Sequence, residues 1–104
     1  EEISALREVF FERINDKNYD AHLEALKGLA LYKDPRVLAP LIKELESKSV
    51  TSASLEAATR MADPALYPVL KSIKKEHITW DFEGLKDALK SCKPKKHYPK
   101  NNSK

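Results

Sequence analysis

A short pattern that occurs twice constrains the fold more than any other feature of this sequence. Its first copy begins at Asp34-Pro35 and its second at Asp63-Pro64, and each continues into a run rich in apolar residues. An Asp carboxylate can accept hydrogen bonds from the first free backbone N–H groups of a helix, and proline at the first helical position gives up no bond. The two copies therefore predict an array of helical hairpins, a class that binds other molecules more often than it transforms them.

The composition also favours helices. Of the 104 residues, 41% are hydrophobic, 34% are charged and two are glycines, while Leu, Ala, Lys and Glu are abundant. These four residue types are good helix formers, so we expect one all-α domain. The single cysteine, Cys92, excludes an internal disulfide and every metal site built from several cysteines.

Apolar residues recur at spacings of three and four, which is typical of amphipathic helices. From this spacing we expect helices over about residues 3–14, 20–32, 34–47, 53–61, 63–76 and 80–92. Asp20 and Thr79 are the expected caps of the second and sixth helices. The apolar stripe of the first helix consists of Ile3, Leu6, Val9, Phe10 and Ile14; the second helix is expected to turn inward Leu23, Leu26, Ala30 and either Leu29 or Leu31.

Three residues interrupt the expected helices. Gly28 lies inside the second helix at a cost of about 1 kcal/mol relative to Ala, which indicates a close approach of another helix. Pro40 and Pro68 lie near the second turns of the two repeated helices, where proline removes a backbone bond and costs about 3 kcal/mol. Because the feature is repeated, we interpret it as a bend that sets the curvature of these helices.

The charge divides the chain into two parts. Residues 1–92 hold 14 Lys or Arg and 16 Asp or Glu, whereas residues 93–104 hold five Lys and no acid. We therefore predict a helical domain over residues 1–92 and a basic, disordered tail over residues 93–104, because the tail has too little apolar surface to offset its ordering entropy. Lys93, Lys95, Lys96 and Lys100 could make electrostatic contacts there.

No apolar run approaches the roughly 20 residues that cross a bilayer, and the first residues lack a basic region and an apolar signal core. These features predict a cytoplasmic protein that does not enter membranes. The chain does not begin with Met, so a removed leader or an origin in a longer repeat array stays open.

The sequence gives no support to catalysis. His22, His77 and His97 each stand alone, without a spacing that could hold a metal. We interpret His77 as a favourable cation near a helix C-terminus. Cys92 has the helical spacing of the apolar residues Phe82, Leu85 and Leu89, which favours a role in core packing. We therefore expect a protein without enzymatic activity, metal or cofactor.

The repeat extends beyond the helix starts. Leu23-Glu24-Ala25-Leu26 aligns with Leu55-Glu56-Ala57-Ala58 ahead of the two Asp-Pro pairs, which gives two units of about 30 residues. This pattern resembles HEAT repeats of the short kind found in bilin-lyase-like proteins, over about residues 20–77. The resemblance implies an α-α superhelix of about six helices, in which two hairpins lie between capping helices.

The resemblance also implies a binding face, because the second helices of HEAT-like hairpins line the concave surface. The outward residues of these helices are Arg36, Lys43, Lys71 and Lys75. They form the candidate face, and the alternative is that they are solvated charges that keep a small domain soluble.

Three functions fit this interpretation. The leading hypothesis is a non-catalytic adaptor that engages a protein partner, suited to an acidic one, through the four basic residues. The alternative is nucleic-acid binding through the same face and the Lys-rich tail. More remote are bilin-lyase-like chromophore handling and an inhibitor or immunity-type role. The identity of the partner and the oligomeric state stay open.

Overall fold

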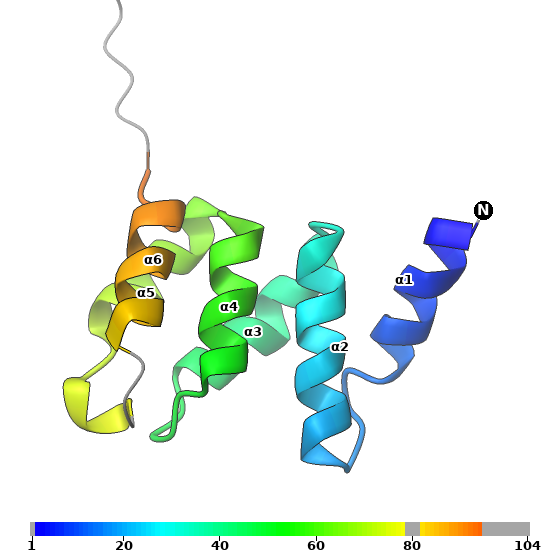
Figure 1. The fold of residues 1–104 in the computed structure, drawn as a ribbon, viewed down its shortest axis with the longest axis horizontal. Helices are drawn as coiled ribbons and strands as arrows, with labels where there is room; N and C mark the ends of the chain where they lie inside the picture. Colours follow the sequence, from blue (N-terminus) through cyan, green and yellow to red (C-terminus); the bar gives the residue numbers. More distant parts are fainter. Residues whose placement is uncertain (1, 79–81, 95–104) are drawn as a thin grey trace, which may run out of the picture.

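The computed structural model describes residues 2–78 and 82–94 and confirms that the fold is all-α (Figure 1). Within these residues, six α-helices and three 3-10 helices follow one another. The α-helices are α1 (Glu2–Glu12), α2 (Tyr19–Leu31), α3 (Leu38–Leu45), α4 (Ser52–Met61), α5 (Tyr67–Ser72) and α6 (Phe82–Cys92). The 3-10 helices are η1 (Pro35–Val37), η2 (Pro64–Leu66) and η3 (Lys75–His77).

The α-helices form two layers. In Figure 1, α2, α4 and α6 lie side by side, and the most extensive contacts between helices join α2 to α4 and α4 to α6. Behind them lie α3 and α5, which contact each other and pack on α4 and α6 respectively. Helix α1 packs against α2 at one end of the stack. The helices from α2 to α6 therefore alternate between the two layers in chain order.

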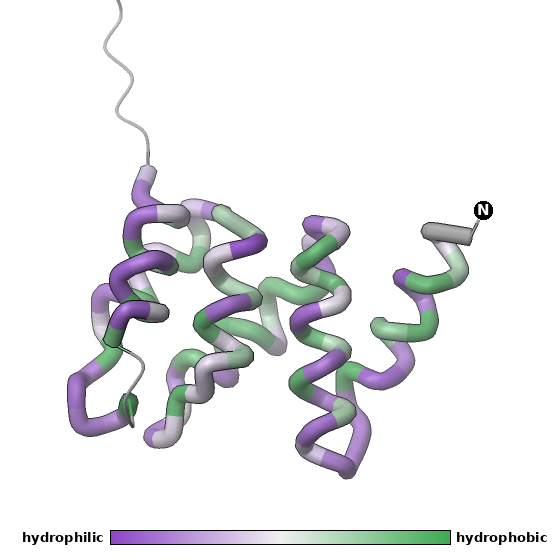
Figure 2. The backbone as a smooth tube through the Cα atoms, viewed as in Figure 1, coloured by the Kyte–Doolittle hydropathy of each residue, from purple (hydrophilic) through white to green (hydrophobic). Residues whose placement is uncertain are grey.

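Apolar side chains from both layers make one core, and Figure 2 shows hydrophobic segments in all the helices. The largest fully buried apolar side chains are Leu26, Leu29, Leu41, Leu45, Leu55, Leu66 and Leu70. Of the two alternatives for the second helix, Leu29 is the inward residue and Leu31 is 58% exposed. The prediction for the first helix is partly wrong, since Leu6 and Val9 are exposed. Among the described helices α1 packs mainly against α2, which leaves its far side uncovered within this part of the chain.

Both repeated helix starts are confirmed as caps. The Asp34 carboxylate accepts the backbone N–H of Arg36 at 3.0 Å, and the Asp63 carboxylate accepts that of Ala65 at 2.9 Å. Each start first forms a 3-10 turn, η1 or η2, and the α-helix begins only afterwards.

This delay corrects the interpretation of the two prolines. Pro40 is the third residue of α3 and Pro68 is the second of α5. Both lie in a first turn, where backbone N–H groups have no partner within the α-helix. The expected loss of a helical hydrogen bond at these prolines is therefore wrong, and they need no bend to be accommodated.

Two other boundaries differ from the predictions. Asn18, not Asp20, caps α2, because its side chain accepts the N–H of Ala21 at 3.1 Å. The predicted helix over residues 63–76 stops at Ser72, and Ile73 has an extended backbone. The predicted cap Thr79 and the tail lysines Lys95, Lys96 and Lys100 lie outside the described residues.

A contact between distant segments accounts for the early end of α5. The N–H of Val50 donates to the His77 carbonyl oxygen at 2.8 Å, and Val50 and Ile78 form an isolated parallel bridge. Both apolar side chains are buried. The connector after α3 therefore holds the segment that follows α5. In this segment Lys75 belongs to the short helix η3 and not to α5.

The close approach expected at Gly28 is confirmed. A methyl group added to Gly28 would lie 2.6 Å from the nearest ring atoms of Phe10. The missing side chain thus lets the Phe10 ring of α1 lie directly on the backbone of α2.

Candidate binding surface

Arg36, the first of the four predicted binding residues, belongs to a junction within the fold. Its guanidinium lies 2.8 Å from the Asp34 carboxylate and 2.8 Å from that of Glu8, and 4.3 Å from the centre of the Phe11 ring. Arg7 adds a third contact, 3.2 Å from Asp34. Arg36 therefore fastens η1 to α1, although part of its side chain stays exposed.

Asp34 is the buried centre of this junction, with 1% of its surface exposed. Hydrogen bonds from the Arg36 side chain, together with those from the Arg36 backbone and Arg7, hold the pKa of this carboxyl well below its usual range in spite of its burial. Asp34 consequently caps η1 as a charged group held between two arginines.

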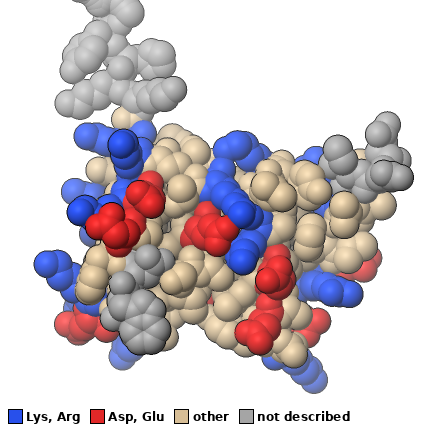
Figure 3. Space-filling model, in the orientation of Figure 1, with Lys and Arg blue, Asp and Glu red and all other residues tan. Residues whose placement is uncertain are grey.

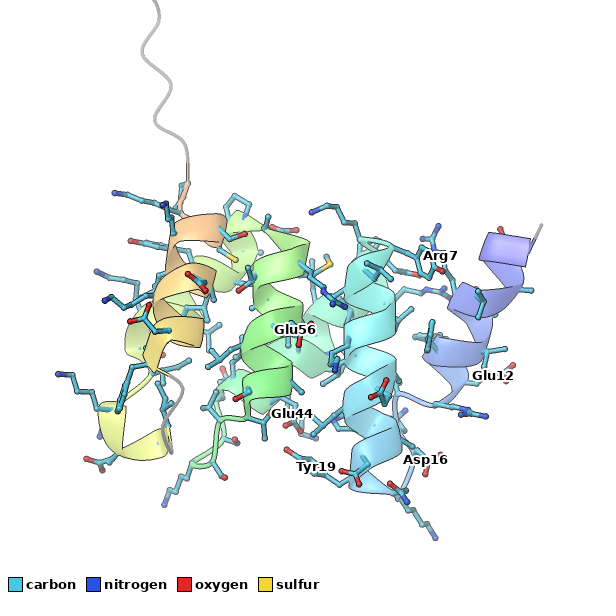
Figure 4. The ribbon with its side chains drawn as sticks, viewed as in Figure 1. Arg7, Glu12, Asp16, Tyr19, Glu44 and Glu56 are labelled. Atoms are coloured by element: carbon cyan, nitrogen blue, oxygen red, sulfur yellow. The ribbon has the colours of Figure 1, made fainter. Side chains whose placement is uncertain are left out.

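Lys43 lies in a different place, beside a hollow of about 310 Å³ between the α1–α2 connector, α2 and α3. Within this hollow the Glu44 carboxylate accepts the Tyr19 hydroxyl at 2.8 Å and lies 3.1 Å from Nε2 of His22 (Figure 4). The Tyr19 and His22 rings stack with centroids 5.8 Å apart. Partial burial and the neighbouring Glu44 raise the pKa of Tyr19.

Three polar side chains of this hollow, Tyr19, His22 and Glu44, contact one another. Nδ1 of His22 contacts the Ile14 carbonyl oxygen while Nε2 contacts Glu44, so both nitrogens face acceptors. Both contacts are hydrogen bonds only when each nitrogen carries a proton. The cluster ties the connector and α2 to α3, and the spacing of single residues could not reveal it, because Glu44 lies 22 positions after His22.

Lys43, Lys71 and Lys75 are exposed, and none of the three makes an ion pair with an acidic side chain among the described residues. Of the four predicted residues, Arg36 is the one that carboxylates hold in the described part of the chain. The Lys71 ammonium lies 5.9 Å from the centre of the Tyr67 ring. Of the four predicted residues, Arg36 belongs to the junction with α1 and Lys43 borders a hollow beside α3. Lys71 and Lys75 belong to α5 and η3, and α5 contacts α3.

Other lysines share the end of the stack where α5 and α6 lie, and sequence reasoning left them out of the candidate face. We use the name lysine end for the exposed lysines of α5, η3, α6 and the residues next to them: Lys71, Lys74, Lys75, Lys86, Lys90 and Lys93. Figure 3 shows Lys side chains along this margin of the molecule. Among the described residues, Lys86 is the one member of this group that makes an ion pair, with Glu83 at 3.5 Å.

The charge of the chain divides earlier than the tail. Residues 1–70 hold nine Lys or Arg and twelve Asp or Glu, whereas residues 71–104 hold ten Lys and four Asp or Glu. A count of charged residues before and after position 70 would have indicated the lysine end, because the lysines of α6 add to those of residues 93–104.

An acidic hollow of about 300 Å³ lies between α4 and α6, lined by Ser52, Glu56, Thr59, Glu83, Gly84 and Asp87. Glu56, labelled in Figure 4, is engaged by Arg60 at 2.6 Å and by Lys27 at 3.9 Å. Among the residues that the structure describes, no His, Cys, Asp and Glu side chains group in a way that could hold a metal ion.

Cys92 is buried and its thiol contacts the carbonyl oxygen of Ala58 at 3.3 Å. Burial raises the pKa of this thiol, which is the opposite of what a nucleophilic cysteine needs. No helix in residues 2–78 and 82–94 is long and apolar enough to cross a membrane.

Comparison with known proteins gives a partial relationship. Protein YibA of Escherichia coli (strain K12) is 40% identical over 70 residues, and Protein YibA of Escherichia coli O157:H7 matches equally. These matches cover 67% of this chain and 25% of the relatives, so the chain spans about a quarter of the proteins that it matches. No family model and no solved structure matches. The names of the relatives state no activity.

Proposed function

We propose that this chain is a non-catalytic helical-repeat module that binds an acidic protein partner through the lysine end. The observation that carries the proposal is the exposure of Lys71 and Lys75 at one end of the stack, where neither makes an ion pair with an acidic side chain among the described residues. Ammonium groups in such a place attract acidic surfaces and mainly raise the rate of association.

The surroundings of Arg36 favour this end over a face centred on Arg36. Arg36 already contacts two carboxylates, Asp34 and Glu8, so a partner would have to compete with them. The lysine end requires no such competition. Lys43 is exposed and also makes no ion pair among the described residues, so it stays compatible with this proposal. The assignment to HEAT-like repeats is part of this proposal and rests on the sequence pattern and the two-layer order of helices.

A capture experiment tests the proposal. The full chain, the variant Lys71→Glu with Lys75→Glu, and a control variant Lys17→Glu with Lys48→Glu serve as baits in an extract of the source cell. The control makes the same change in net charge at exposed residues outside the lysine end. We expect a protein that the wild type and the control retain and the first variant loses, while all three unfold at the same temperature.

The result that contradicts the proposal is retention of the same proteins by all three baits. Loss of the retained protein from both variants would also contradict the proposal. Such a result would show that binding depends on the net charge of the bait and does not depend on the position of the lysines.

Nucleic-acid binding is the second candidate, favoured by the lysines that continue from α6 toward the tail: Lys86, Lys90 and Lys93. It predicts that affinity for duplex DNA falls with salt, with a slope of about −0.9 for each phosphate neutralised. Removal of residues 93–104 should flatten this slope. An absence of detectable DNA or RNA binding at low salt would dismiss this candidate.

A further inference from the structure

The C-terminal end of α4 is closed in a different way from a simple helix end. Helix α4 ends at Met61, and the last four carbonyl groups of an α-helix have no partner within it. In the described part of the chain, the backbone that follows α4 returns to one of these carbonyls, because the N–H of Ala62 donates to the Ala58 oxygen at 3.1 Å. The carbonyls of residues 59–61 therefore depend on donors from other elements.

Side chains from both sides of α4 supply these donors. From the turn after α2, the Lys33 ammonium donates to the Arg60 carbonyl oxygen at 2.6 Å and to that of Met61 at 3.4 Å. A lysine in this place also interacts favourably with the negative end of the helix dipole. From α6, the Ser91 hydroxyl donates to the Thr59 carbonyl oxygen at 2.6 Å. The end of α4 is therefore held by groups that lie far from it in the sequence.

The end of α2, which lies at the equivalent place in the first repeat, is closed by its own backbone. The N–H of Lys33 donates to the Ala30 carbonyl oxygen and the N–H of Asp34 donates to that of Leu29, both at 3.0 Å. Each of the two helix ends precedes an Asp-Pro pair. The side chains of Lys33 and Ser91 thus do for α4 what backbone groups do for α2.

Lys33 makes its contacts from an unfavourable backbone conformation. Its φ is 53°, and Ala62, the residue before the second Asp-Pro pair, has a φ of 50°. Residues other than glycine rarely adopt this left-handed region, because their Cβ crowds the backbone. Glycine at position 33 would relieve the backbone but would remove the ammonium group from the end of α4.

We propose that Lys33 is a strap that ties the two Asp-Pro turns together and holds the last turn of α4 closed. The carbonyls that it binds lie directly before Ala62 and Asp63, where the chain turns into η2 and α5. The C-terminal ends of α2, α4 and α6 lie on the same side of the stack (Figure 1). The strap therefore fixes the place where the second repeated helix begins, whether or not a partner binds the lysine end.

Amide hydrogen exchange followed by NMR tests the strap, because exchange of the Ala62 N–H requires the end of α4 to open. Lys33→Met removes the charge and keeps most of the side-chain length. We expect about tenfold faster exchange at Ala62, as for the loss of a hydrogen bond from a charged group. Lys33→Arg keeps a charged donor and should restore most of the protection. Lys48→Met, at an exposed lysine in the connector before α4, is the matched control and should leave exchange at Ala62 unchanged.

A second amide separates the strap from a general loss of stability. The N–H of Val50, which donates to the His77 carbonyl oxygen, lies before the start of α4, and its exchange should not change in Lys33→Met. Lys33→Gly should speed exchange at Ala62 as Lys33→Met does, while it lowers the free energy of unfolding less than Lys33→Ala, because glycine adopts the left-handed region readily.

Unchanged exchange at Ala62 in Lys33→Met would overturn the proposal. Equal acceleration at Ala62 and Val50 would do the same, because it would show that the whole fold is weakened and that no local strap exists. A Lys48→Met variant with the same effect at Ala62 would show a response to net charge alone.

Discussion

Asp34 and Asp63 occupy the same place in two copies of one pattern, and their environments make them a matched pair for mutation. Both carboxylates cap a 3-10 turn that begins with proline. Only Asp34 is buried and held by Arg7 and Arg36. Replacing each by alanine therefore separates the contribution of the cap to the free energy of unfolding from the contribution of the arginine contacts.

The expected magnitudes follow from these contacts. Loss of a cap costs about 1 kcal/mol, which is the whole cost expected for Asp63→Ala. Hydrogen bonds to charged groups contribute about 1.5–3 kcal/mol, so Asp34→Ala should destabilise the fold by about 3 kcal/mol or slightly more. The cost should stay near this value because Arg36 is partly exposed and keeps its contact with Glu8.

Urea unfolding followed by far-ultraviolet circular dichroism measures both free energies of unfolding. The predicted difference between the two variants is about 2 kcal/mol, a large part of the 5–15 kcal/mol typical of small domains. Equal losses in the two variants would refute the claim that the arginines stabilise the junction of α1 with η1. In a double variant with Arg36→Ala, the loss should fall short of the sum of the single losses, as expected for residues in contact.

Three further predictions concern pH, packing and the thiol. The lowered pKa of Asp34 contributes stability that is present above the unfolded value of about 4 and is lost as pH falls below it. The free energy of unfolding should therefore drop less in Asp34→Asn than in wild type between neutral pH and about pH 2; equal drops would contradict this. Gly28→Ala should destabilise by about 1–3 kcal/mol, because the added methyl group meets the Phe10 ring, and Phe10→Leu should relieve part of the loss in urea unfolding. Cys92 should react with a thiol reagent only after denaturation, because its side chain is buried, and fast reaction in the native protein would refute that placement.

Features that depend on neighbouring residues could be predicted from the sequence. The Asp-Pro starts, the six helical segments and the close approach at Gly28 all follow from local hydrogen bonding, apolar spacing or the absence of a side chain. The fold class followed from the same signals.

Features that depend on distant residues could not. The predicted helix over residues 63–76 breaks because His77 bonds to Val50, which lies 27 positions earlier. Arg36 looked like a free surface cation because nothing in its own helix shows that Glu8 and Phe11 of α1 reach it. Leu6 and Val9 had the spacing of buried residues, but spacing does not show which faces of a helix the neighbouring helices cover.

The binding role of the candidate residues stays a prediction. Helical spacing put all four of them on the surface, where the structure has them, whereas the contribution of α6 depends on its packing beside α5. That packing gathers Lys86, Lys90 and Lys93 at the same end of the stack. Use of this end by a partner is the part of the account that experiment has to decide.

Calorimetric titration of a captured partner against the three proteins described above tests this central claim most directly. The account predicts that Lys71→Glu with Lys75→Glu weakens the affinity by about tenfold or more, equivalent to about 1.4 kcal/mol, at the ionic strength where the wild type binds. Lys17→Glu with Lys48→Glu should bind nearly as well as the wild type. Equal affinities for all three proteins, or equal losses in the two variants, would contradict the claim that the lysine end is the binding surface.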